Sequence, residues 1–111
     1  MDIETIKSNL LTVIKQFNDN RANILSAANQ QGGQDAVAKL EANFDDLNNQ
    51  YDQLLEQELD VNNAAYSGLS DQADSETTQL QASLSNLQDI NQTITLCSSV
   101  ISTVASIVTM V

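Results

Sequence analysis

Residues 80–108 read LQASLSNLQDINQTITLCSSVISTVASIV, and apolar side chains recur through this stretch at intervals of seven residues. The row begins upstream and comprises Ala73, Leu80, Leu87, Ile94, Ile101 and Val108. A second row starts midway and comprises Ile90, Cys97, Val104 and Val111. A repeat of this period is typical of an amphipathic helix that packs against other helices. The pattern therefore predicts one continuous helix over residues 70–111, with a broad apolar surface from residue 90 onward.

Two earlier segments, residues 2–29 and 34–61, show apolar residues at steps of three and four, which is typical of amphipathic helices. Gly32 and Gly33 separate them, and paired glycines favour a turn. A second break is expected near residue 60, followed by Gly68 as a helix stop and Ser70 as the next N-cap. The residues expected to form the seam between these two helices are Ile3, Ile6, Leu10, Val13, Phe17, Leu40, Phe44, Leu47, Tyr51 and Leu54.

These lengths predict the fold class. At about 1.5 Å per residue, a helix over 70–111 would reach roughly 60 Å, against roughly 40 Å for each earlier helix. Part of the C-terminal helix would then lack an internal partner. The sequence therefore predicts an all-α protein with a single domain over residues 1–111. Its architecture is expected to be an elongated helical hairpin or a three-helix coiled-coil bundle with a long C-terminal helix.

The charges are distributed unevenly along the chain. The net charge is −11, and all four cations, Lys7, Lys15, Arg21 and Lys39, precede residue 40. Eleven of the fifteen acids follow residue 40, and the last of them is Asp89. A purely anionic segment repels phosphate backbones and anionic headgroups. We therefore expect no binding to nucleic acid.

The sequence contains few groups that could carry chemistry. It has no His and a single cysteine, Cys97, so imidazole or multi-thiolate metal sites are excluded. Cys97 falls on an apolar helix, where it is expected to be a small buried hydrophobe. The acids Glu56, Glu58 and Asp60 lack the glycine and terminal glutamate of a calcium loop and are expected to form a solvated helix face. We expect no enzymatic activity, no cofactor and no metal.

Residues 90–111 carry no charge, which permits two interpretations. Small hydroxyl residues let helices approach closely, which favours a surface for assembly with other helices. Membrane insertion stays open because about 20 apolar residues can span a bilayer. Asn91 in the apolar seam could fix the register of an assembly, or could simply face water. The residues expected to form the assembly surface are Leu80, Leu84, Leu87, Asn91, Ile94, Cys97, Ile101, Val104 and Val108.

The stretch from Glu76 through Asn91 to the end of the chain, beginning ETTQLQASLSN, resembles the C-terminal helix of EspA-like filament and needle-tip proteins of type III secretion. Those proteins also end in a long Gln-, Ser- and Asn-rich helix that turns apolar. The resemblance implies a secreted structural subunit that assembles through this helix, and a cytoplasmic chaperone that covers the helix before export. A second resemblance, carried by Tyr66-Ser67-Gly68, is to the small helical-hairpin substrates of type VII secretion, which have a Trp-x-Gly turn.

The N-terminus, Met1-Asp2-Ile3-Glu4, is acidic where a cleavable signal peptide has a basic start. The protein is therefore expected to be cytoplasmic, or to reach the cell surface by a route that leaves its N-terminus uncut. Three functions remain open at this point. The first is a secreted subunit of a bacterial secretion apparatus that assembles through its C-terminal helix. The second is a translocator or pore component that inserts residues 90–111 into a membrane, and the third is a cytoplasmic helical adaptor or chaperone.

Overall fold

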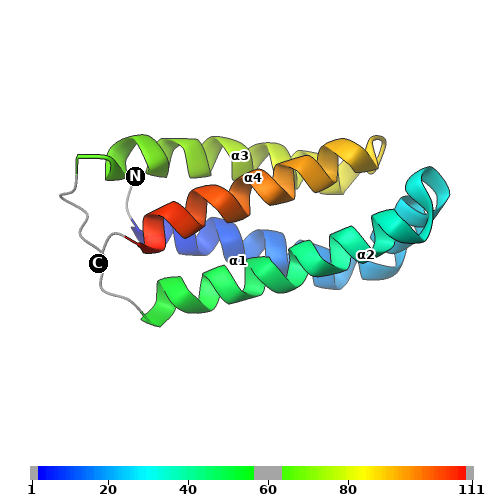
Figure 1. Ribbon diagram of the computed structural model, residues 1–111, viewed down its shortest axis with the longest axis horizontal. Helices are drawn as coiled ribbons and strands as arrows, with labels where there is room; N and C mark the ends of the chain where they lie inside the picture. Colours follow the sequence, from blue (N-terminus) through cyan, green and yellow to red (C-terminus); the bar gives the residue numbers. More distant parts are fainter. Residues whose placement is uncertain (1–2, 57–63, 110–111) are drawn as a thin grey trace.

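In the computed structural model, residues 3–56 and 64–109 are described, and within them the chain is built from helices alone (Figure 1). The helices are α1 (Ile3–Asp19), α2 (Arg21–Glu56), α3 (Tyr66–Asn86) and α4 (Ile90–Val108). The prediction of an all-α protein is confirmed. The helices lie side by side along one axis, and the molecule measures 45 × 22 × 21 Å.

The packing places α1 and α4 diagonally opposite each other. α1 packs against α2 and α3, and α4 packs against the same two helices. α1 and α3 run parallel, because Asn9 Nδ2 donates to Asp74 Oδ1 at 3.1 Å and Gln16 Nε2 donates to the Gln81 carbonyl at 3.1 Å, with the same spacing of 65 residues in both pairs. α4 therefore has a neighbour on each of two sides, and its remaining surface faces solvent.

α1 and the first part of α2 follow one another almost without interruption, close to the helix predicted over residues 2–29. The Asn20 amide donates to the Gln16 carbonyl at 3.2 Å, and the Ile24 amide donates to the Asn20 carbonyl at 2.9 Å. The chain then reverses at Gly33, whose φ of 70° and ψ of −163° lie in a region that essentially only glycine adopts. A Cβ on Gly32 would lie 2.7 Å from the Cβ of Ala36. Both glycines of the predicted turn are therefore required.

The prediction of one continuous helix over residues 70–111 is wrong. α3 ends at Asn86, and Leu87 adopts the left-handed conformation with φ 52° and ψ 29°. Asp89 is extended and caps α4, because its Oδ1 accepts from the Gln92 amide at 3.1 Å. The chain turns back there, so α4 has only 19 residues and lies alongside α3 (Figure 1). The length mismatch that predicted an uncovered half-helix does not exist in the described residues.

The predicted helix stop at Gly68 and N-cap at Ser70 are also wrong. α3 begins at Tyr66, so both residues lie inside its first two turns, and Ser70 is fully buried. The predicted end of the second helix at residue 61 and the break near residue 60 lie outside the described residues, as does the C-terminal end of the helix predicted to reach residue 111.

Candidate interaction surface

The predicted seam residues lie where the helices meet. Phe17 and Phe44 stack with ring centroids 4.4 Å apart, and the Arg21 guanidinium lies over both rings at 5.7 and 5.6 Å. Ile3 and Tyr51 are half-buried at the edge of the core. The other predicted seam residues are buried, namely Ile6, Leu10, Val13, Phe17, Leu40, Phe44, Leu47 and Leu54.

The predicted assembly residues divide into three groups. Five are buried in the core of the chain itself, namely Leu80, Leu84, Cys97, Val104 and Val108. Three are half-buried and pack against that core, namely Leu87, Ile94 and Ile101. Asn91 is exposed. The five buried side chains pack against other residues of the same chain. They are therefore not part of an uncovered apolar surface.

The surface that α4 does present is different from the predicted one, and we call it the α4 outer face. It comprises the exposed residues Asn91, Gln92, Thr95, Ser98, Ser102, Ser106 and Thr109. Ile94, Leu96, Ile101 and Ala105 are half-buried beside it. Residues 90–109 include no ionisable group other than Cys97, which is buried. The α4 outer face is therefore an uncharged strip of amides and hydroxyls on a chain whose net charge is −11.

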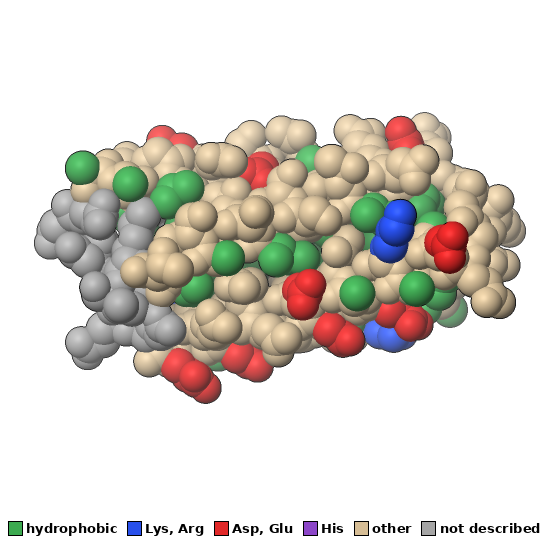
Figure 2. All heavy atoms as spheres, in the orientation of Figure 1, with side chains coloured by type: hydrophobic (Ala, Val, Ile, Leu, Met, Phe, Trp, Pro, Cys, Tyr) green, Lys and Arg blue, Asp and Glu red, His purple; other side chains and the backbone are tan. Residues whose placement is uncertain are grey.

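The neighbouring helix α2 contrasts with this strip. Asp45, Asp52 and Glu56 are exposed on α2, and Asp71 is exposed on α3. Figure 2 shows acidic side chains gathered along the lower edge of the molecule, over α2, and mostly uncharged side chains over α4. The α4 outer face thus lacks the acidic side chains that α2 exposes.

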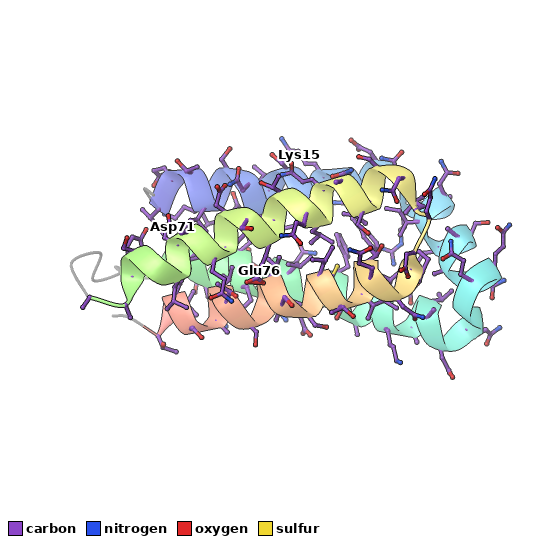
Figure 3. All side chains as sticks on the ribbon, turned by 90° about the horizontal axis from the view of Figure 1, so that it is seen from above. Lys15, Asp71 and Glu76 are labelled. Atoms are coloured by element: carbon purple, nitrogen blue, oxygen red, sulfur yellow. The ribbon has the colours of Figure 1, made fainter. Side chains whose placement is uncertain are left out.

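Buried hydroxyls line the contact between α3 and α4. Thr103 Oγ1 donates to Glu76 Oε1 at 2.7 Å, and Ser83 and Thr93 share a hydrogen bond between their hydroxyls. Glu76 Oε2 is buried and has no hydrogen-bond partner. In Figure 3 the Glu76 side chain lies in the seam between these two helices. The α3–α4 contact is therefore more polar than the stacked aromatic contact between α1 and α2.

Beside this seam, near the turn between α3 and α4, the surface has an open hollow of about 210 Å³. It is lined by Gln79, Ala82, Ser83, Asn86 and Gln92, none of them charged. Gln92 also belongs to the α4 outer face, so the hollow extends that uncharged surface across to α3.

The start of α4 is held by a residue that sequence reasoning missed. Gln31 Nε2 donates to the Leu87 carbonyl at 2.8 Å, and its Oε1 accepts from the Ile90 amide at 2.9 Å. These bonds satisfy two backbone groups of the turn between α3 and α4. No sequence pattern marks a polar side chain for such a role, because the two segments lie more than fifty residues apart.

Cys97 behaves as the sequence predicts in one respect, since it is buried. Desolvation by burial raises the pKa of its thiol from 9.0 to about 12. A thiol with this pKa has almost no thiolate at neutral pH, and thiolate is the nucleophilic form. The side chain is therefore an inert part of the core.

Two properties of the described residues bear on chemistry and membranes. Residues 3–56 and 64–109 hold no group of three His, Cys, Asp or Glu side chains placed to bind a metal ion. Within the same residues, Ile90–Val108 is the one helix long and apolar enough to cross a membrane, with a mean hydropathy of 1.2. Helices from the core of soluble proteins meet the same criterion.

Comparison of the chain with models of known protein families, with curated proteins and with solved structures found no match. The fold places the chain among all-α proteins.

Proposed function

We propose that this chain is a non-catalytic helical subunit that binds a protein partner through the α4 outer face. The observation that carries the proposal is the absence of charge on this face in a chain with eleven more acids than bases. Protein interfaces are depleted in charged residues at their centre, and small side chains let helices approach closely. The half-buried Ile94 and Ile101 beside the strip would add apolar contact area.

We further propose that the partner is a component of a bacterial secretion apparatus, or another copy of this chain within one. Support for this step comes from the sequence alone, since the Gln-, Ser- and Asn-rich stretch from Glu76 through Asn91 to the end of the chain resembles type III filament and needle-tip proteins. Those proteins have one long helix there, whereas this chain divides the stretch between α3 and α4. On this proposal the protein is bound by a chaperone before export.

The proposal can be tested by placing one charge on the strip. Ser102→Asp puts a carboxylate in the middle of the α4 outer face, at an exposed position where folding should tolerate it. Asn49→Asp adds the same charge at an exposed position of α2 and serves as the control. Circular dichroism should show that both variants keep the helical content of the parent chain.

Sedimentation velocity over a concentration series then measures self-association. We expect the parent and Asn49→Asp to form the same oligomer and Ser102→Asp to remain monomeric. If the parent is monomeric throughout, photo-crosslinkers placed at Ser102 and Asn49 in secreting cells distinguish the remaining cases. Crosslinks to a secretion component from position 102 alone support the proposal, and equal crosslinking from both positions contradicts it.

Membrane insertion is the second candidate, and the length and hydropathy of Ile90–Val108 favour it. Insertion would require α4 to leave its contacts with α2 and α3. Leakage of dye-loaded vesicles by the parent chain, abolished by Ser98→Asp but not by Asn49→Asp, would support this function. An absence of leakage and of vesicle co-flotation would exclude it.

A further inference from the structure

The first three turns of α3, residues 66–77, which we call the α3 strap, bury mainly small or hydroxyl-bearing side chains after Tyr66. Between Tyr66 and Leu80 the buried row of this helix consists of Ser70, Ala73 and Thr77. Each of these side chains is small or carries a hydroxyl, so each buries little apolar area. The corresponding row of α1, by contrast, includes Leu10, Val13 and Phe17.

Local helix propensity is low in the same residues. Ala65, at the N-cap position, makes no side-chain capping bond, whereas Asp89 caps α4. The strap reads YSGLSDQADSET, and its glycine, serines, aspartates and threonine are poor formers of helix interiors. Gly68 alone disfavours the helical state relative to alanine. Packing and propensity therefore act in the same direction, and both favour local unfolding of this segment.

The hydrogen bonds show what the α3 strap covers. Glu76 bonds to Thr103 and Ser83 to Thr93, so α3 and α4 are antiparallel and the strap lies along the last turns of α4. Buried residues of those turns are Val104, Ile107 and Val108. On its other side, the bond between Asn9 and Asp74 sets the strap alongside Ile6 and Leu10 of α1.

We propose that the α3 strap is a built-in cover that opens ahead of the rest of the bundle. Opening uncovers the apolar end of α4 and so controls how much of that helix a partner can reach. This regulatory role rests on the function proposed above, in which α4 is the binding element. The opening itself is a property of the isolated chain and can be measured without a partner.

Hydrogen exchange followed by mass spectrometry or NMR tests the opening directly. We expect the amides of residues 70–77 to exchange at least about tenfold faster than those of residues 43–54, which likewise lie beyond the first turn of their helix, α2. The first amides of α3 are left out of the comparison because the start of any helix exchanges readily. Equal protection of the two segments would overturn the proposal.

Gly68→Ala tightens the strap without touching its contacts, because a Cβ at this position meets nothing within 4 Å. The gain in helix propensity should slow exchange of residues 70–77 about fivefold, while residues 43–54 change less. Ser26→Ala, at an exposed position in α2, is the control and should leave the strap unchanged. Uniform slowing of the whole chain by Gly68→Ala would also overturn the proposal, because it would mean that the strap opens only with global unfolding.

Partner binding separates the two proposals. If the strap must open for binding, Gly68→Ala should lower the association rate by a factor similar to its effect on exchange. Unchanged binding together with slowed exchange would contradict the covering role and leave binding through the α4 outer face intact. If Ser102→Asp abolishes binding while hydrogen exchange of the α3 strap stays unaltered, the result supports binding through the α4 outer face independently of the strap.

Discussion

Three side chains make the C-terminal apolar sequence turn back on itself. Leu87 takes a left-handed conformation that costs a residue with a Cβ roughly 1–2 kcal/mol. Asp89 offsets part of this cost by capping α4, and Gln31 satisfies two backbone groups of the turn. Leu87 is also half-buried against the core, which explains why an apolar residue occupies such a position.

At Gly33 we predict a backbone effect without a packing effect. Gly33→Ala adds a Cβ that meets nothing within 4 Å, but φ is 70° and ψ is −163°, which alanine adopts only under strain. We expect a loss of about 1–3 kcal/mol in the free energy of unfolding, measured by urea denaturation. Gly68→Ala, at a helical glycine with equally open space, should instead be stabilising. A loss of stability in both variants, or in neither, would contradict this explanation.

At Cys97 we predict a pH effect. Burial raises the pKa of the folded thiol from 9.0 to about 12, so above pH 9 the unfolded chain loses a proton that the folded chain retains. The contribution of this group is therefore fully present below pH 9 and is lost as the pH rises toward 12, by up to about 1.4 kcal/mol per pH unit. Thermal melts between pH 8 and 10 should fall more steeply for the parent than for Cys97→Ala. Parallel pH profiles would show that the thiol ionises freely in the folded state.

Among the elements, the two helical segments on either side of Gly32 and Gly33 could be predicted from the sequence, whereas the boundary between α1 and α2 at residue 20 and the one between α3 and α4 could not. Steps of three and four mark the buried face of a helix directly, and Leu10, Phe17 and Leu47 are buried. The row through Leu80, Leu87 and Ile94 keeps its seven-residue step across the turn, and this concealed the break. The sequence feature that marks the start of α4 is the second row of apolar residues, which begins at Ile90 directly after an aspartate suited to an N-cap.

The α4 outer face, too, could be predicted only in part from the sequence. An uncharged segment after residue 89 is visible in the sequence, but which side of it faces solvent depends on the neighbours that the fold supplies. Because the turn at Leu87 places α4 against α2 and α3, Cys97 and Val104 are buried, whereas Ser98 and Ser102 are exposed to solvent. The hydroxyl contacts of Glu76 and Ser83 could not be found from spacing, because they join two helices through a turn that was not predicted.

Removing the cap tests how α4 begins. Asp89→Ala deletes the oxygen that accepts from the Gln92 amide and should cost about 1 kcal/mol, seen as a lower Tm. Asp89→Ser retains an acceptor and should recover most of the loss. Asp71→Ala removes a similar exposed charge that caps no helix and is the control. Equal effects of Asp89→Ala and Asp71→Ala would mean that charge, not capping, is what Asp89 supplies.

At the scale of the whole molecule, charge opposes folding. The net charge is −11, and the described residues hold two ion pairs, Lys7 with Glu4 and Arg21 with Glu41. Salt should therefore screen repulsion more than it weakens attraction. We expect the Tm to rise when sodium chloride is raised from about 10 mM to about 150 mM, over which the Debye length shortens from about 30 to about 8 Å. A falling Tm would indicate that attractive pairs dominate.

The claim on which the rest depends is that the C-terminal third folds back as two antiparallel helices, so that α4 is sheltered on one side and free on the other. The most direct test is a distance between spin labels at Ser67 and Ser106, two exposed positions near the start of α3 and the end of α4, in a Cys97→Ala background. We predict a separation comparable to the 22 × 21 Å cross-section of the molecule. A distance of about 60 Å, as expected for 39 residues of continuous helix, would contradict the fold and with it the α4 outer face and the α3 strap.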